Sequence, residues 1–189
     1  IQSIFWRNSN LNFNNKISLL KSLEERPNRD WLKRINECED EKVLKYFLND
    51  KHNINIEDNL EVLKIIWECC QIPDFVKKAY GNHLDVVSKV FKFLTGKTKK
   101  IPNQYMKEQL SVLDKLEGNV DSLSNRIANV RTWSYVSNKS NWVENQDYWI
   151  ERTKNLEDKL SDRLHEELTK TFIDKRASVL ARGLKQDIL

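Results

Sequence analysis

The sequence of 189 residues predicts an all-α protein, a bundle of about seven helices that ends in one long helix. From Tyr148 to Leu189 the chain contains no Pro and a single Gly. Over this stretch apolar residues recur about once per helical turn, as in a long amphipathic helix. They are Trp149, Leu156, Leu160, Leu164, Leu168 and Phe172. The whole chain has only four Gly and three Pro, so we expect few turns and long elements.

In the N-terminal part we expect a connector and short helices. Residues 1–13 mix apolar anchors with polar residues and predict a connector that docks on the helical body. Residues 16–25 predict a short helix that ends before Pro27, because proline does not continue a helix. Residues 29–49 predict one or two helices, with a break near residues 38–40.

The middle of the chain is expected to form the core of the protein. Residues 50–55 are polar and predict a loop. Residues 58–71 predict a helix with apolar side chains on nearly all of its faces, which we expect to be the most buried helix. Residues 80–94 place apolar side chains at alternating steps of three and four, which again predicts a helix. The basic stretch 95–102, which contains Gly and Pro, predicts an exposed loop.

The last third predicts three helices. Residues 104–116 predict a helix capped by Gly118. The apolar spacing over 120–135 predicts a second helix. A polar turn at 137–140 separates it from the final helix, which we expect to begin near Asn141. Residues 1–56 would then form a connector with short helices, and residues 57–189 a helical bundle, together one compact unit.

Composition narrows the class of protein. The net charge of +4, from 32 basic and 28 acidic residues, permits nucleic-acid contact without demanding it. Three Cys, with Cys69 next to Cys70, suggest no disulfide framework and indicate reduced thiols in a cytoplasmic protein. No apolar run reaches the roughly 18 residues of a membrane span, and we expect no membrane partner and no signal peptide. The start at Ile1 rather than Met suggests an excised fragment.

Two short motifs resemble chemical sites but lack essential parts. Gly96–Thr98 is like the end of a phosphate-binding loop, but Phe91 stands where the first Gly is needed and a helix precedes it. His165 opens a sequence like a zinc-protease helix, but Thr169 replaces the second ligand. We therefore predict no metal site and no catalytic residue here. A nucleophilic Cys served by a distant His stays open, although burial in a helix core is the commoner role.

Three basic groups are candidate contacts for a nucleic acid. They are Lys97, Lys99 and Lys100 in the predicted loop, Arg126 and Arg131 near Trp133 and Tyr135, and Lys175, Arg176 and Arg182 near the end. Such side chains bind phosphates, and Arg with aromatic residues can stack bases. Alternatively, the first and last groups are a solvated loop and a helix end, and the middle group packs against the final helix. Residues 151–176 hold seven acidic and seven basic side chains, which suits a solvated face or a protein contact.

Several stretches together resemble a known family. In chain order they are FWRNSNLNF with SLLKSLEERP, IIWECCQIPDF, RIANVRTWSYVSN, and YWIERTKNLEDKLSDRLHEELTKTFIDKRASVL. They are similar to the C-terminal helical region of alphaproteobacterial superfamily-two, DExH-type helicases related to the mitochondrial degradosome RNA helicase. They span nearly the whole chain, and each is structural rather than catalytic.

The resemblance implies a parent protein that is an ATP-dependent RNA or DNA helicase, with its motor domains N-terminal to Ile1. ATP and Mg²⁺ would be bound by those domains, so the fragment would hold no cofactor and would not hydrolyse ATP alone. Its implied role is to support nucleic-acid binding and to brace the motor. The implied partners are the motor domains of the parent chain, a single strand of RNA or DNA and, as a further candidate, a nuclease.

Two other functions stay open. One is a helical protein–protein interaction module without nucleic-acid binding. The other is a free-standing enzyme with a cleft around Cys69 and Cys70.

Overall fold

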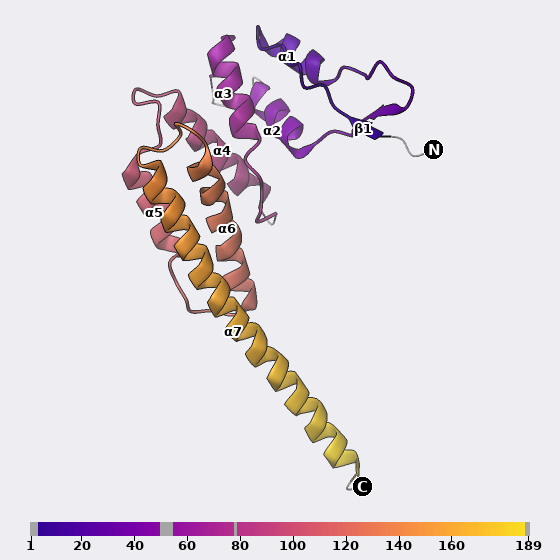
Figure 1. Cartoon of the computed structure of the whole chain (residues 1–189), viewed down its shortest axis with the longest axis vertical. Helices are drawn as coiled ribbons and strands as arrows, with labels where there is room; N and C mark the ends of the chain where they lie inside the picture. Colours follow the sequence, from indigo (N-terminus) through magenta and orange to yellow (C-terminus); the bar gives the residue numbers. More distant parts are fainter. Residues whose placement is uncertain (1–3, 50–54, 78, 188–189) are drawn as a thin grey trace. The chain divides into compact units, whose positions relative to one another are not determined.

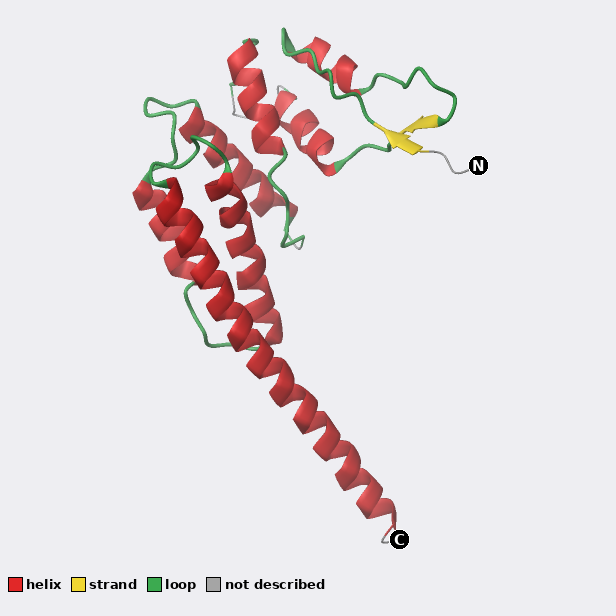
Figure 2. Ribbon diagram, viewed as in Figure 1, coloured by secondary structure: helices red, strands yellow, loops and turns green. Residues whose placement is uncertain are grey.

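Helices dominate this chain. The computed structural model describes residues 4–49, 55–77 and 79–187, and these ranges contain seven helices and one sheet of two strands (Figures 1 and 2). In chain order the elements are β1 (Ile4–Trp6), α1 (Lys16–Leu23), β2 (Leu32–Arg34), α2 (Glu39–Leu48), α3 (Leu60–Cys70), α4 (Tyr80–Leu94), α5 (Asn103–Leu113), α6 (Val120–Asn138) and α7 (Gln146–Asp187). The predicted all-α class and the long final helix are confirmed.

The elements belong to two compact units. The first holds β1 to α4 and extends to Ile101, and the second holds α5 to α7 from Pro102 onward, with the short segment 75–77. The boundary expected after residue 56 lies within the first unit, between α2 and α3, which contact each other. Nearly all of the loop expected at 50–55 lies outside the described residues.

The N-terminal part contains a sheet that local patterns did not indicate. Strand β2 occupies a stretch where a helix was predicted, and it pairs in parallel with β1, placing Ile4 opposite Leu32 and Trp6 opposite Arg34. Only one helix, α2, follows, and it begins at Glu39, where the break was expected. The helix prediction over 29–38 is wrong because the backbone of β2 finds its partners in β1, about 28 residues earlier, and this pairing leaves no local periodic signal.

The first unit buries the helices whose apolar spacing predicted them. Asn15 caps α1 by accepting a hydrogen bond from the Ser18 amide. In α3, the predicted core helix, Leu63, Ile66 and Cys69 have no exposed surface. Helix α4 has the predicted bounds and buries Val87 and Val90 completely.

The second unit is built around the contact between α6 and α7. Asn119 caps α6 by accepting from the Ser122 amide, and the seam of Leu123, Ile127 and Val130 is buried. The turn before α7 lies at 139–145, later than predicted, and it buries Trp142 and Val143.

Gly118 does not cap α5, which ends at Leu113 with Asp114 as its C-cap. Gly118 has a φ of +127°, which favours glycine. An added Cβ there would lie 3.1 Å from Cβ of Ser122, so the start of α6 also needs a small residue.

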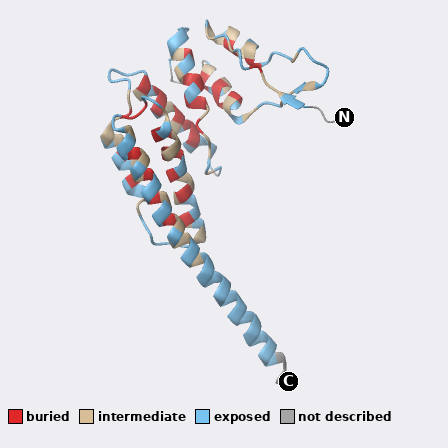
Figure 3. Ribbon diagram, viewed as in Figure 1, coloured by how far each residue is buried: buried red, intermediate tan, exposed pale blue. Residues whose placement is uncertain are grey.

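The two halves of α7 have different surroundings. In the first half Trp149, Thr153, Leu156 and Leu160 are buried. From Leu168 to Lys185 every residue is exposed, and Figure 3 shows this part of the helix continuing past the other helices of its unit. None of the described helices, α7 included, has the length and apolar character needed to cross a membrane.

Replacing Leu160 by Ala should lower the free energy of unfolding by about 2–5 kcal/mol, because it removes a fully buried side chain and leaves a cavity. Urea unfolding measures this loss. The matched control is Leu180→Ala on the same helix, where the side chain is 65% exposed. The control should change the value by no more than about 0.5 kcal/mol. Equal losses for the two variants would show that the far half of α7 is packed in solution.

Candidate functional site

The loop after α4 presents three lysines. Lys97 and Lys99 are exposed and Lys100 is half-buried, and none of them forms an ion pair with a described residue. The Thr95 hydroxyl anchors one end of the loop by donating to the Phe91 carbonyl at 2.8 Å. The fully buried Ile101 anchors the other end. The loop therefore holds unpaired positive charge between two fixed ends.

Arg126 is engaged within its own unit. Its Nη1 donates to the Lys115 carbonyl at 2.8 Å and also to the Glu117 carbonyl. These carbonyls belong to the segment that follows α5, where the helical hydrogen bonds have stopped. Arg126 thus satisfies backbone acceptors of the α5–α6 connection.

Arg131 connects α6 to α7. Its Nε lies 2.8 Å from a carboxylate oxygen of Glu157. The neighbouring Trp133 is only 4% exposed and packs edge-on against Tyr105 at 5.8 Å between ring centroids. A buried ring has no free face for a base, so in this structure the pair of Arg131 and Trp133 belongs to the packing of α6.

The third basic group lies on the exposed half of α7. Lys175, Arg176 and Arg182 are exposed and form no ion pair with a described residue. The guanidinium of Arg176 lies over the Phe172 ring, 5.8 Å from its centroid. These residues belong to the second unit and the lysine loop to the first, so the predicted basic residues are spread over both units.

A hollow of about 420 Å³ between α5 and the start of α7 was not predicted. Its lining is Asn103, Gln104, Lys107, Leu110, Ser111, Asn145, Tyr148, Trp149 and Arg152. The Trp149 Nε1 donates to Asn103 Oδ1 at 2.9 Å, which joins the two helices. Tyr148 is 57% exposed and meets Trp149 edge-on at 4.8 Å. The lining combines an exposed aromatic ring, side-chain amides and two cations, which suits a base with its phosphate. No sequence signal indicated it, because α5 and α7 lie about 40 residues apart.

Asp114 organises the cations at the end of α5. Its carboxylate accepts from Lys159 at 2.8 Å and from Arg152 at 2.9 Å. These two hydrogen bonds, that from Lys159 first, hold the pKa of Asp114 below its ordinary value. Part of the Arg152 charge in the hollow is therefore balanced by the protein itself.

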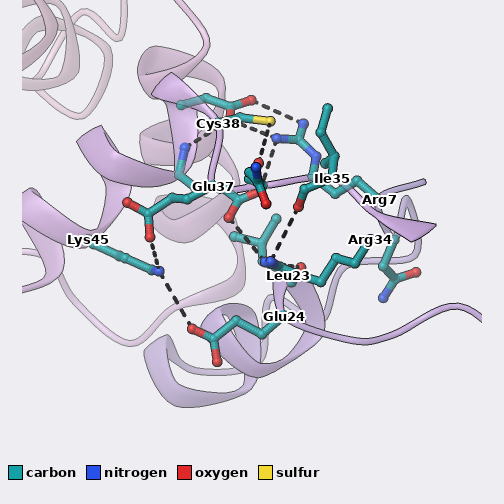
Figure 4. A network of polar contacts seen from close by, with 12 residues as sticks. Arg7, Leu23, Glu24, Arg34, Ile35, Glu37, Cys38 and Lys45 are labelled. Atoms are coloured by element: carbon teal, nitrogen blue, oxygen red, sulfur yellow. Dashed lines mark hydrogen bonds and ion pairs between the residues drawn. The ribbon is translucent and has the colours of Figure 1, made fainter. Parts of the chain in front are cut away.

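The first unit contains an acidic cluster. Cys38, Asp40 and Glu41 offer ligand atoms that all lie within 4.8 Å of one another. Arg7 binds both oxygens of Asp40, at 2.7 and 3.1 Å, and this raises the pKa of Arg7. Glu41 is buried and lies 3.4 Å from Arg7 and 3.3 Å from Arg34. Figure 4 shows Arg7 and Arg34 within this polar network.

This cluster fits a structural role better than a metal site. Its carboxylates are already neutralised by two guanidinium groups, which a cation would have to displace. Arg7 follows β1, Arg34 ends β2, and Glu41 lies in α2, so the ion pairs fasten the small sheet to the helix. Arg7 also lies over the Trp67 ring of α3, at 5.4 Å from the centroid.

The two adjacent cysteines of α3 lack the environment of a nucleophile. Cys69 and Cys70 are buried in α3. Burial raises the pKa of the Cys70 thiol well above its ordinary value, and the thiolate is the reactive form. This environment argues against the enzyme with a cleft around these residues.

Comparison with known proteins found no match to this chain among the family models, the curated proteins or the solved structures.

Replacing Asp114 by Asn should weaken the second unit in a pH-dependent way. The folded pKa of Asp114 lies below the unfolded value, so its stabilisation is present above the ordinary pKa of about 3.9 and is lost as the pH falls through the folded value. Because the site is partly exposed, we expect a loss of about 0.5–1 kcal/mol at neutral pH, shrinking below about pH 4. Urea unfolding across this pH range measures it. Asp162→Asn, at an exposed position, is the control and should have little effect. A loss that does not change with pH would contradict this interpretation.

Replacing Glu41 by Gln should lower the free energy of unfolding by about 3 kcal/mol, because it removes the buried charge that pairs with Arg34 and Arg7, although Arg7 keeps Asp40. The control is Glu39→Gln in the same helix, where the side chain is 79% exposed and 3.8 Å from Lys42. It should cost no more than about 0.5 kcal/mol. Similar values for both variants in urea unfolding would rule out a fastening role for Glu41.

Proposed function

We propose that this chain is an accessory helical domain of an ATP-dependent RNA or DNA helicase, which contacts the phosphates of a single strand and braces the motor domains. The proposed binding to nucleic acid rests on one observation. In the loop after α4, Lys97, Lys99 and Lys100 form no ion pair with a described residue. The helicase part rests on the sequence stretches that resemble that family.

The loop suits contact with a phosphate backbone. Lysine amines bind phosphates as point charges, without reading the base sequence. Arg126 and Arg131 are less suited, because backbone carbonyls and Glu157 already occupy their guanidinium groups. The hydrogen bond of Thr95 and the burial of Ile101 fix both ends of the loop, which limits the entropy lost on binding.

The hollow between α5 and α7 offers a second contact. Lys107 is exposed and has no ion pair with a described residue, so its amine is available to a phosphate. The Tyr148 ring is exposed and is held by Trp149, which supports stacking of an unpaired base. An aromatic residue next to a cation is a common way to hold a single strand without sequence preference.

The bracing role rests on the sequence resemblance, and two of the resembling stretches lie in packed helices. IIWECCQIPDF contains Ile66 and Trp67, which are buried in α3, and RIANVRTWSYVSN contains Ile127 and Val130, which are buried in α6. These stretches build the two helical units. In this proposal ATP and Mg²⁺ belong to the motor domains of the parent protein, and this chain supplies surfaces rather than chemistry.

The second candidate is a protein-interaction module without nucleic-acid binding. The exposed apolar residues on the far half of α7 favour it, because such surfaces mark protein contacts. The two candidates differ in whether the chain binds RNA, and phosphate contact makes that binding fall steeply with salt because counterions are released.

Replacing Lys97 or Lys99 by Ala should weaken binding to a labelled single-stranded RNA and lower the slope of log K against log salt by about one. Fluorescence titration at several salt concentrations measures both. Lys42→Ala is the matched control, because this lysine already pairs with Glu39 at 3.8 Å and its loss should leave the slope unchanged. No RNA binding by the unmodified chain at low salt would reject the phosphate contact and favour the protein-interaction module.

A further inference from the structure

Residues 168–185, which we call the α7 tip, expose one broad apolar face. Six large side chains on it are between 48% and 66% exposed, namely Leu168, Phe172, Ile173, Val179, Leu180 and Leu184. Since a helix turns by about 100° per residue, they form two neighbouring rows. Leu168, Phe172 and Val179 make one row, and Ile173, Leu180 and Leu184 make the other. An apolar face of this extent, opposite a polar face, is typical of a helix that packs against a partner.

The charges of the α7 tip are unbalanced and unpaired. It carries one acidic residue, Asp174, against five basic residues, Lys170, Lys175, Arg176, Arg182 and Lys185. None of the six forms an ion pair with a described residue, whereas Arg152, Lys159 and Arg163 in the first half of α7 all do. The tip thus presents positive charge that the protein leaves without a counterpart.

Arg176 occupies the middle of the apolar face. By the same helical rotation it falls between the two rows, and its guanidinium lies over Phe172 at 5.8 Å from the ring centroid. Lys175 and Arg182 border the row of Leu168 and Val179 on its outer side. A partner that covers the face must therefore accept a cation at its centre and further cations at one edge.

The central position of Arg176 decides which kind of partner can cover the apolar face: a second copy, a lipid surface or a protein groove. In a pair of α7 tips, either parallel or antiparallel and centred on the face, Arg176 would meet its own copy, and like charges in a desolvated contact oppose association. On a lipid surface, the centre of the apolar face enters the acyl region, where a charged side chain is costly, and membrane-surface helices keep their basic residues on the polar side. A protein groove with apolar walls would bury both apolar rows, and a carboxylate inside the groove would pair with the Arg176 guanidinium.

We propose that the α7 tip docks as a helix in the apolar groove of an acidic protein, with a partner carboxylate paired to Arg176 at the centre of the contact. Burial of the two apolar rows supplies the affinity, and the charge pair fixes the register of the helix in the groove. Carboxylates at the edge of the groove pair with Lys175 and Arg182. This surface is separate from the lysine loop of the proposed function, and it takes a protein rather than a nucleic acid.

The test uses the full chain and two synthetic helical-hairpin peptides, each with a leucine-lined groove between its two helices. The residue at the centre of the groove and those at its edges are Glu in one peptide and Lys in the other. The unmodified chain should bind the Glu peptide, and Arg176→Glu should weaken that binding by at least about tenfold while increasing binding to the Lys peptide. Leu180→Asp should abolish binding to the Glu peptide. Val112→Asp, at an equally exposed apolar position of α5, should leave it unchanged.

Several results would overturn the proposal. They are equal binding of both peptides, equal effects of Leu180→Asp and Val112→Asp, or no binding of the Glu peptide. Self-association that Leu180→Asp abolishes would assign the face to a second copy, and binding of anionic vesicles in place of the peptide would assign it to lipid. Circular dichroism checks that each variant keeps its helices. The RNA titration of Leu180→Asp should match that of the unmodified chain, so a failure of this proposal stays separate from a failure of RNA binding.

Discussion

The contact between α6 and α7 is the constraint on which the second unit depends. Helix α6 has 19 residues and α7 has 42, so α7 is longer by about 35 Å at 1.5 Å per residue. The buried side chains along the two helices set how they lie beside each other, and the exposed ion pair of Arg131 with Glu157 links them at the surface. Because α6 begins at Val120, its seam covers α7 only as far as the region after Leu160. The exposed half of α7 follows from this difference in length.

The same packing separates the basic residues into two kinds. Some arginines beside the packed helices have partners within the chain. Arg126 donates to two carbonyl groups, and Arg152 pairs with Asp114. The basic residues on the loop after α4 and on the α7 tip form no ion pair with a described residue. A long side chain next to a helix end or a carboxylate becomes part of the fold, and one without such neighbours stays available to a ligand. The two proposed surfaces are the places where this positive charge is left over.

Local patterns predicted most of the helices because apolar spacing reflects burial on one side of a helix. The bounds of α4 came out as predicted, and the buried side chains of α3 lie where its apolar run placed them. Two of the failures have one cause. Strand β2 exists through its pairing with β1, and the turn before α7 extends to Asn145 because Trp142 and Val143 are buried away from a helix. In both places a distant contact overrides the local preference.

The sequence by itself determined the helical class, the order of the helices and the residue types of the lysine loop, because periodicity and composition are properties of neighbouring residues. The tertiary structure alone decided which arginines are engaged, where Tyr148 and Lys107 come together, and which half of α7 is covered. Leu160 and Leu168 belong to the same apolar spacing in the sequence, yet Leu160 is buried and Leu168 is 48% exposed. The reason is that burial and ion pairing depend on the length and placement of a second helix, which the pattern of the first does not contain.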